Sequence, residues 1–185
     1  MNRRNHAGFS LLHVTVIVAV LGGLAATLYP LFHPHSTCGK QPQCLSNQKH
    51  CAIAMIQYSG DFDGILPASS RWMDEIHSYG LSERDYHDLA VPTGEYGYAF
   101  RKSASSLDTD KLESPASFIL EFESNRKGRS ASADLSALLR VSRHGPKSGV
   151  NVAFADGHVR SLSSPGGIVS IEDALVADRS AGPKP

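Results

Sequence analysis

A long apolar segment near the start of the chain constrains the fold more than any other feature. Between Phe9 and Phe32 the only ionisable side chains are those of His13 and Tyr29, and His13 lies close to the beginning of the segment. As an α-helix these residues would extend about 36 Å, which exceeds the roughly 30 Å hydrocarbon core of a bilayer. A domain of this size rarely buries a helix that is apolar on every side, so the segment is predicted to be a transmembrane helix.

Charges beside this segment predict its orientation. Arg3 and Arg4 precede it, and no acidic residue occurs before Asp61. The positive-inside rule then predicts a single-pass protein of the cytoplasmic membrane, with a cytoplasmic N-terminus and a periplasmic C-terminal domain. A cleavable secretory signal is the alternative, although the segment is longer than a usual h-region and its small-residue site, 22–26, is followed by more apolar residues.

The start of the apolar segment carries a third interpretation. The sequence GFSLL at residues 8–12, after a short basic leader, resembles the cleavage site of type IV prepilins and type II secretion pseudopilins. Gly22 and Pro30 also stand where pilin helices commonly carry Gly and Pro. The resemblance implies that a prepilin peptidase cuts after Gly8 and methylates Phe9. It further implies assembly with other pilin-like subunits at the inner membrane.

Position 13 departs from this family. Pilins usually have Glu five residues after the Gly, and the resemblance implies that this residue pairs with the N-terminal amine of a neighbouring subunit. Here the position is His13. A neutral His can accept a hydrogen bond from the amine, whereas a protonated His would repel it.

Composition excludes some other classes of function. The chain has 185 residues, with Lys+Arg and Asp+Glu balanced at 18 each. Without the leader and the apolar segment about 150 residues remain, enough for one modest domain. The balanced charge, with no cluster of basic and aromatic residues, gives no sign of a nucleic-acid partner.

Three cysteines, Cys38, Cys44 and Cys51, follow the apolar segment. On a straight helix Cys44 and Cys51 would lie about 10 Å apart along the axis, too far for a disulfide, so a bridge between Cys38 and Cys44 is the more plausible pairing. A zinc site with nearby histidines is the alternative, although the spacings match no standard zinc pattern.

Prolines and glycines at 30–42 are expected to interrupt the helix before periodicity resumes towards residue 60. The sequence CLSNQK at 44–49, with Tyr58, DFDG at 61–64 and Pro67, resembles a subgroup of prepilin-type proteins of unassigned function. Within the resemblance, Val91 stands where the subgroup has Cys. Asp61 and Asp63 are predicted either to form an Asp/Gly turn or to begin a Ca²⁺ loop, since calcium prefers carboxylate and carbonyl oxygens.

The second half of the chain predicts a sheet. Residues 118–122, FILEF, are typical of a β-strand, and Trp72 is expected to anchor the core rather than bind a ligand. Asp156-Gly157 between two short β-rich runs predicts a hairpin with a two-residue turn that places Phe154 opposite Val159.

The hairpin region also resembles the C-terminal signature of the same subgroup. The matching residues are His144, Asn151, Asp156, Gly157 and His158. We expect structural roles for them, with His144 bonded to a turn carbonyl and Asp156 capping its hairpin. A metal site and catalysis are the alternatives, but no third ligand and no nucleophile with a partner base lie at a useful spacing.

Together these features predict an α+β fold: leader 1–8, transmembrane and assembly helix 9–32, helix continuation 33–60, globular domain 61–162 with an antiparallel sheet, and tail 163–185. The resemblance implies a pseudopilin-like structural protein of a type II secretion or type IV pilus-like complex. An unpolymerised, membrane-anchored binding module is the alternative. No enzyme activity is expected, and no cofactor apart from the calcium option.

Overall fold

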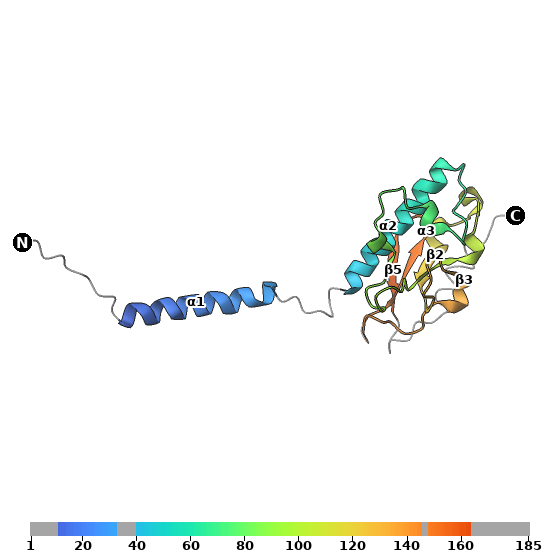
Figure 1. Ribbon diagram of the computed structural model, residues 1–185. Helices are drawn as coiled ribbons and strands as arrows, with labels where there is room; N and C mark the ends of the chain where they lie inside the picture. Colours follow the sequence, from blue (N-terminus) through green and yellow to red (C-terminus); the bar gives the residue numbers. More distant parts are fainter. Residues whose placement is uncertain (1–10, 33–39, 146–147, 164–185) are drawn as a thin grey trace, which may run out of the picture. The chain divides into compact units, whose positions relative to one another are not determined.

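The computed structural model describes residues 11–32, 40–145 and 148–163, which fall into two units. The first unit contains helix α1, and the second contains the other helices and the strands (Figure 1). The predicted leader, Gly8 and Phe9 lie outside the described residues, as does the predicted tail beyond its first residue.

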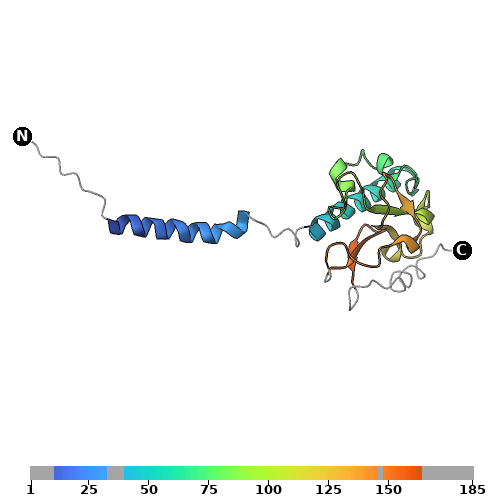
Figure 2. The ribbon, with the colours of Figure 1, turned by 60° about the horizontal axis from the view of Figure 1, so that its bottom comes forward.

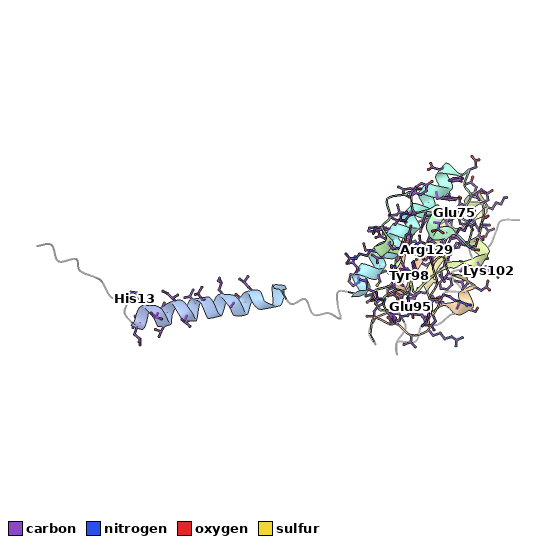
Figure 3. All side chains as sticks on the ribbon, in the orientation of Figure 1. His13, Glu75, Glu95, Tyr98, Lys102 and Arg129 are labelled. Carbon is purple, nitrogen blue, oxygen red and sulfur yellow. The ribbon has the colours of Figure 1, made fainter. Side chains whose placement is uncertain are left out.

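Helix α1 (Leu11–Phe32) is 22 residues long and carries mostly Leu, Val and Ala. Its large apolar side chains are exposed, from 41% at Leu28 to 83% at Leu11. His13 lies at the beginning of the helix and is also exposed (Figure 3). A helix is thus present where the sequence predicted one, over Leu11–Phe32, and its described large apolar side chains are exposed.

The predicted membrane location is wrong. Among the described residues, no helix is both long enough and apolar enough to cross a membrane. The finding contradicts a single-pass protein of the cytoplasmic membrane with a periplasmic domain.

Helix α2 (Lys40–Asp61) opens the second unit. Pro42 was expected to interrupt a helix, but it lies in the first turn of α2, where a missing backbone N–H removes no intrahelical hydrogen bond. Cys44, Cys51 and Met55 are fully buried on one side of the helix. Their spacings of seven and four residues are those of an amphipathic helix, as the sequence predicted.

Cys44 and Cys51 are both free thiols. The predicted bridge from Cys44 to Cys38 is therefore wrong, and Cys38 itself lies outside the described residues. The spacing argument against a bridge between Cys44 and Cys51 is confirmed, because both residues belong to one continuous helix.

Short helical turns connect α2 to the sheet and the strands to one another. Their bounds are α3 (Trp72–Glu75), η1 (Glu83–Tyr86), η2 (Lys102–Ala104), η3 (Thr109–Lys111), η4 (Pro115–Ser117) and η5 (Leu135–Ala137). Trp72 is fully buried and its ring N–H donates to the carbonyl of Ala131 at 3.1 Å. Its predicted role as a core anchor is confirmed.

Among the described residues, five strands form a sheet in the order β3-β1-β2-β4-β5. Figure 2 shows the second unit, which contains these strands, from another side. Their bounds are β1 (Tyr98–Arg101), β2 (Ile119–Glu123), β3 (Ser132–Ala133), β4 (Val150–Phe154) and β5 (Val159–Leu162). Neighbouring strands are antiparallel except for the parallel pair β1–β3. The structure thus confirms the α+β class and the predicted strand at 118–122, and adds one parallel pair to the antiparallel sheet.

Apolar side chains pack on both faces of the sheet. One cluster joins α2 and α3 to Phe100 and Leu120, and a second joins Ile119, Phe122 and Val152 to the segment around η5. Ile119 and Leu120 enter different clusters because successive strand residues point to opposite faces, and the β-bulge between Ile119 and Glu121 lets Ile119 and Phe122, three residues apart, share one cluster. α2 packs against β2, β4 and β5, so it covers the face that carries the first cluster.

The β4–β5 hairpin exists as predicted, but its register differs by one residue. Ala153 rather than Phe154 lies opposite Val159, and the backbone N–H of Phe154 donates to the carbonyl of His158 at 2.9 Å. The loop therefore has three residues. Only Gly157 within it has a positive φ, of 83°, as in a type I turn followed by a left-handed residue. Asp156 keeps an ordinary backbone conformation, so a two-residue turn was the wrong prediction.

Candidate functional site

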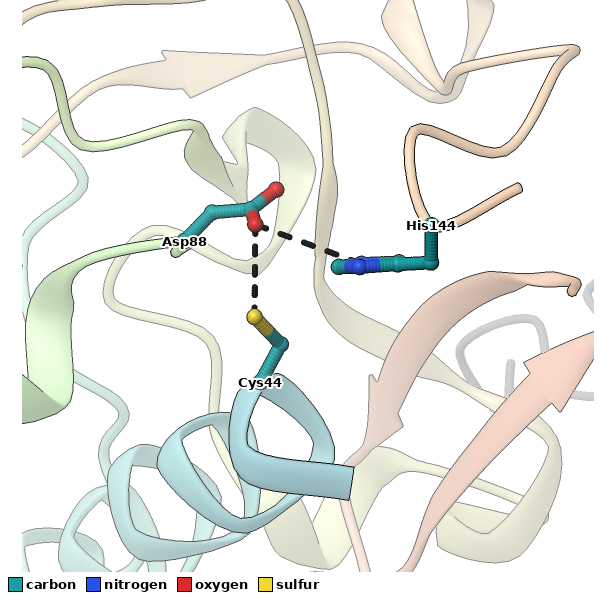
Figure 4. Close-up of side chains that lie close together, drawn as sticks. All are labelled: Cys44, Asp88 and His144. Atoms are coloured by element: carbon teal, nitrogen blue, oxygen red, sulfur yellow. Dashed lines mark hydrogen bonds and ion pairs between the residues drawn. The ribbon is translucent and has the colours of Figure 1, made fainter. Parts of the chain in front are cut away.

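A group of polar side chains, all buried except the partly exposed Arg143, lies where the first half of α2 meets one end of the sheet. We call it the polar cluster. Its members come from α2, the segment after η1, the end of β2, the turn before β4, and β4 itself: Cys44, Asp88, Glu123, Arg143, His144 and Asn151. Figure 4 shows three of them, Cys44, Asp88 and His144, converging from separate segments.

Asp88 is the centre of the polar cluster. Its Oδ2 accepts from Arg143 Nη1 at 2.7 Å, and its Oδ1 accepts from the backbone N–H of Ala90 at 2.9 Å and from the thiol of Cys44 at 3.3 Å. Oδ1 also lies 4.0 Å from Nε2 of His144. The carboxylate is thus bonded to three different segments of the chain while its side chain is fully buried.

Local backbone geometry makes room for this contact. Gly97 has a φ of 83°, and a Cβ there would lie 2.8 Å from both Asp88 Cβ and Arg143 Nη1. Only glycine satisfies the conformation and the spacing together. Arg143 extends across this position, where its guanidinium also donates to the carbonyl oxygens of Gly97 and Ser124. The tight approach holds the ion pair of Asp88 and Arg143 in one geometry.

Glu123 organises the other side of the polar cluster. Its Oε1 lies 2.8 Å from Nε2 of His144 and accepts from Nδ2 of Asn151 at 2.8 Å. The predicted bond from His144 to a turn carbonyl is wrong, because the ring contacts the carboxylate of Glu123. Among the described residues Glu123 Oε2, His144 Nδ1 and Asn151 Oδ1 are buried without a hydrogen-bond partner. Such atoms are destabilising unless a further group satisfies them.

Burial controls the protonation of the cluster. Burial and the nearby Asp88 raise the pKa of the Cys44 thiol to about 12. Burial also raises the pKa of Glu123, even though His144 acts in the opposite direction. For His144 burial acts to lower the pKa, but Glu123 and Asp88 outweigh it and the pKa is raised. A protonated, buried thiol is a poor nucleophile, so the cluster as it stands does not resemble a cysteine catalytic site.

Glu121 lies beside the polar cluster on β2 and is an unusual carboxyl group. It is fully buried, and both of its oxygens lack a hydrogen-bond partner among the described residues. Burial raises its pKa well above the ordinary range. The neutral acid is therefore the form that the folded domain accommodates.

This burial predicts that the domain loses stability as the pH rises. Above the unfolded pKa of about 4.5 the unfolded chain ionises Glu121 while the folded chain keeps it protonated. The stability that Glu121 contributes is fully present below that pH. It is lost as the pH rises towards the pKa of the folded state, by about 1.4 kcal/mol per pH unit. In urea unfolding measured from pH 4 to 8, Glu121→Gln should remove this dependence of the free energy of unfolding on pH. Glu113→Gln, a control at an exposed position, should leave it in place. An unchanged slope in Glu121→Gln would contradict the assignment.

Asp156, Gly157 and His158 form the tip of the hairpin rather than part of the polar cluster. Asp156 Oδ1 accepts from the backbone N–H of His158 at 3.0 Å and from its ring Nδ1 at 2.5 Å. The expected cap on the hairpin is thus confirmed. The His158 ring stacks on Phe154, with 4.1 Å between ring centroids. His144 bonds Glu123 instead, so the three predicted site residues His144, Asp156 and His158 do not form one site.

Removing this cap should have a modest effect on stability. Asp156→Ala is expected to lower the free energy of unfolding by about 1 kcal/mol, because the N–H of His158 loses its charged acceptor. Asp156→Asn retains an acceptor oxygen and should recover about half of the loss. Equilibrium unfolding in urea measures both variants. Equal stabilities of wild type and Asp156→Ala would show that the cap contributes nothing.

Asp61 and Asp63 lie at the end of α2 and in the following turn. Asp61 Oδ2 accepts from the Tyr79 hydroxyl at 2.9 Å, and Asp63 has a φ of 51°. The structure does not place either residue in the group of three potential metal ligands found among the described residues. The predicted Asp/Gly turn is present, and calcium binding remains a prediction without further support.

Sequence reasoning missed the residues that organise the polar cluster. Asp88 and Glu123 were not singled out, and neither was the burial of Asn47 and Gln48 on α2. One signal was present. The strand ILEFE alternates acidic and large apolar residues, which indicates a strand with two carboxylates turned towards one layer of the domain.

Comparisons with known proteins found no match to this chain. No family profile matches the chain, and neither a curated protein nor a solved structure gives a significant match. The likeness to prepilin-type proteins consequently rests on the sequence motifs alone, and function is inferred from the residues and their arrangement.

Proposed function

We propose that the protein is a pseudopilin-like structural subunit, cut after Gly8 and methylated at Phe9, that assembles through α1 with other pilin-like subunits. The observation that carries the proposal is the apolar surface of α1, which is exposed along the described part of the helix. A helix with such a surface needs a partner, because large exposed apolar areas mark interaction sites.

The apolar surface of α1 extends around the helix. Val16, Ile17 and Val18 are consecutive and are 55%, 47% and 64% exposed. Successive residues of an α-helix point about 100° apart, so these three alone cover more than half of the circumference. Gly22 and Gly23 have no atom within 4 Å of an added Cβ. Small residues of this kind let two helices approach closely, which suits packing between like helices.

The second unit has the properties of a subunit head. It contains its own apolar clusters, one around Trp72 and one around Phe122. These clusters hold α2 and the sheet together without contributions from α1 residues. Such a domain can remain folded while α1 exchanges partners during assembly, which is what a filament subunit requires.

A crosslinking experiment tests the assembly. Val18→Cys should give disulfide-linked dimers under mild oxidation, because copies of α1 place the same position side by side. Val141→Cys is the matched control, since Val141 is 62% exposed against 64% for Val18 but lies on the second unit. The unsubstituted chain under the same oxidation reports any contribution from the native cysteines.

The crosslinking experiment has three possible outcomes. Dimers that form with Val18→Cys but not with Val141→Cys support assembly through α1. A chain that stays monomeric with both variants contradicts the proposal and favours an unpolymerised binding module. Equal crosslinking of both variants indicates random collision and contradicts it as well.

A further inference from the structure

We propose that the polar cluster is a binding site for a divalent transition metal of the Zn²⁺ type, with Cys44, Asp88 and His144 as ligands. One potential ligand atom from each residue lies within 4.8 Å of the others, and all three residues are buried. They contribute sulfur, carboxylate oxygen and imidazole nitrogen, which is the mixed ligand set that zinc accepts. This site is separate from α1 and from the proposed assembly.

Distances between the ligand atoms fit a four-coordinate ion. Metal–ligand bonds of about 2.0–2.3 Å in a tetrahedron place neighbouring ligand atoms about 3.3–3.5 Å apart. In the structure Cys44 Sγ lies 3.3 Å from Asp88 Oδ1, and Asp88 Oδ1 lies 4.0 Å from His144 Nε2. The first separation already has the tetrahedral value to within a few tenths of an ångström, and the second must shorten by about 0.7 Å, shared between the two side chains. Glu123 Oε1, 2.8 Å from the same nitrogen, is a candidate fourth donor once its hydrogen bond to that nitrogen is given up.

The surroundings hold the ligands as metal sites usually do. Arg143 binds Oδ2 of Asp88 and leaves Oδ1 directed towards the cluster. The backbone N–H of Leu89 donates to Cys44 Sγ at 3.3 Å, a contact that favours a thiolate. Outer groups that orient the first ligands in this way are typical of metal centres. A metal would also replace the thiol proton, as coordinating cysteines bind in the deprotonated form.

The charges of the polar cluster can balance those of a divalent ion. A thiolate at Cys44 and carboxylates at Asp88 and Glu123 carry three negative charges, and a divalent cation with Arg143 carries three positive charges. The buried group is then neutral, with His144 as an uncharged ligand. Without the ion, the polar cluster is also compensated, by a protonated thiol at Cys44 and by the pairs of Asp88 with Arg143 and of Glu123 with His144. Metal binding would therefore exchange for protons.

Cobalt is the probe that tests the site. The full-length chain, reduced and stripped with a chelator, is titrated with Co²⁺, whose spectrum reports thiolate ligation and tetrahedral geometry. We expect saturation at one Co²⁺ per chain with a thiolate-to-cobalt charge-transfer band, and displacement by Zn²⁺. Cys44→Ser should abolish that band. Cys51→Ser, which alters the other buried free thiol of α2, is the matched control and should retain it.

A second measurement on the unsubstituted chain guards against variants that fail to fold. X-ray absorption of the zinc-loaded protein should show one sulfur among otherwise nitrogen and oxygen ligands. Absence of saturable binding, a band that survives Cys44→Ser, or a first shell without sulfur would each overturn the proposal. Failure of α1 crosslinking would leave it untouched, so the two proposals fail independently.

Discussion

Asp88→Ala should lower the free energy of unfolding by about 3–5 kcal/mol, the usual effect of removing one partner from a buried ion pair. The reason is that Arg143 would keep its charge after losing the carboxylate of Asp88, which lies 2.7 Å from its Nη1. The thiol of Cys44 and the N–H of Ala90 would lose their acceptor in the same step. Three segments of the chain would then be held together less tightly.

Chelator-treated protein in a urea titration measures this loss without a contribution from bound metal. Asp88→Leu combined with Arg143→Met is the matched comparison, because it removes both charges at once. The double variant should be more stable than either single variant, since replacing a whole buried pair with apolar residues is often close to neutral. A loss below about 1 kcal/mol for Asp88→Ala, the level of an exposed pair, would contradict the central position of Asp88.

Val18→Asp should abolish self-association of the chain. In an assembly this side chain would be packed between apolar helices, and burying an unpaired carboxylate is destabilising by several kcal/mol per charge. We expect association to weaken by roughly 100-fold or more, equivalent to about 3 kcal/mol. The second unit should remain folded, because its apolar clusters contain no α1 residue.

Sedimentation velocity over a range of concentrations measures the effect. Val141→Asp introduces the same charge at an equally exposed valine of the second unit and should associate as the unsubstituted chain does. Far-UV circular dichroism checks that both variants keep their secondary structure. Association unaffected by Val18→Asp, or reduced equally by both substitutions, would remove α1 as the assembly surface.

Local patterns predicted most of the fold. The periodicity of α2, the strand at 118–122 and the hairpin around Gly157 all follow from nearest-neighbour chemistry that is visible in the sequence. The hairpin register was misjudged because an Asp-Gly pair fits two kinds of turn. Only the hydrogen bond between Phe154 and His158 shows that the loop has three residues. Pro42 was misjudged for a similar reason, since its effect depends on whether it lies inside a helix or at its start.

The polar cluster could not be predicted in the same way. Its contacts join residues far apart in the chain, such as Cys44 to Asp88 and Glu123 to His144. No periodic pattern records which loop residue will reach a given position on a helix. His144 and Asn151 were singled out by resemblance and prove to be buried partners of Glu123. Asp88 had no motif, and only the folded arrangement reveals its central place.

The apolar segment shows the limit of a composition argument. Its length and hydrophobicity predicted a membrane crossing, and the described residues contain no helix that meets that requirement. The same residues do form the exposed helix α1. Assembly between copies of α1 is consequently the interaction that now needs a direct test.

Processing after Gly8 is the step on which the proposed assembly depends, and the intact mass of the chain tests it most directly. The full-length protein is expressed in a host that carries a prepilin peptidase, and its mass and N-terminal sequence are determined. The proposal predicts a chain that begins at Phe9 and is heavier than the bare sequence by one methyl group. A chain that begins at Met1, or one that begins after residues 22–26, would contradict it.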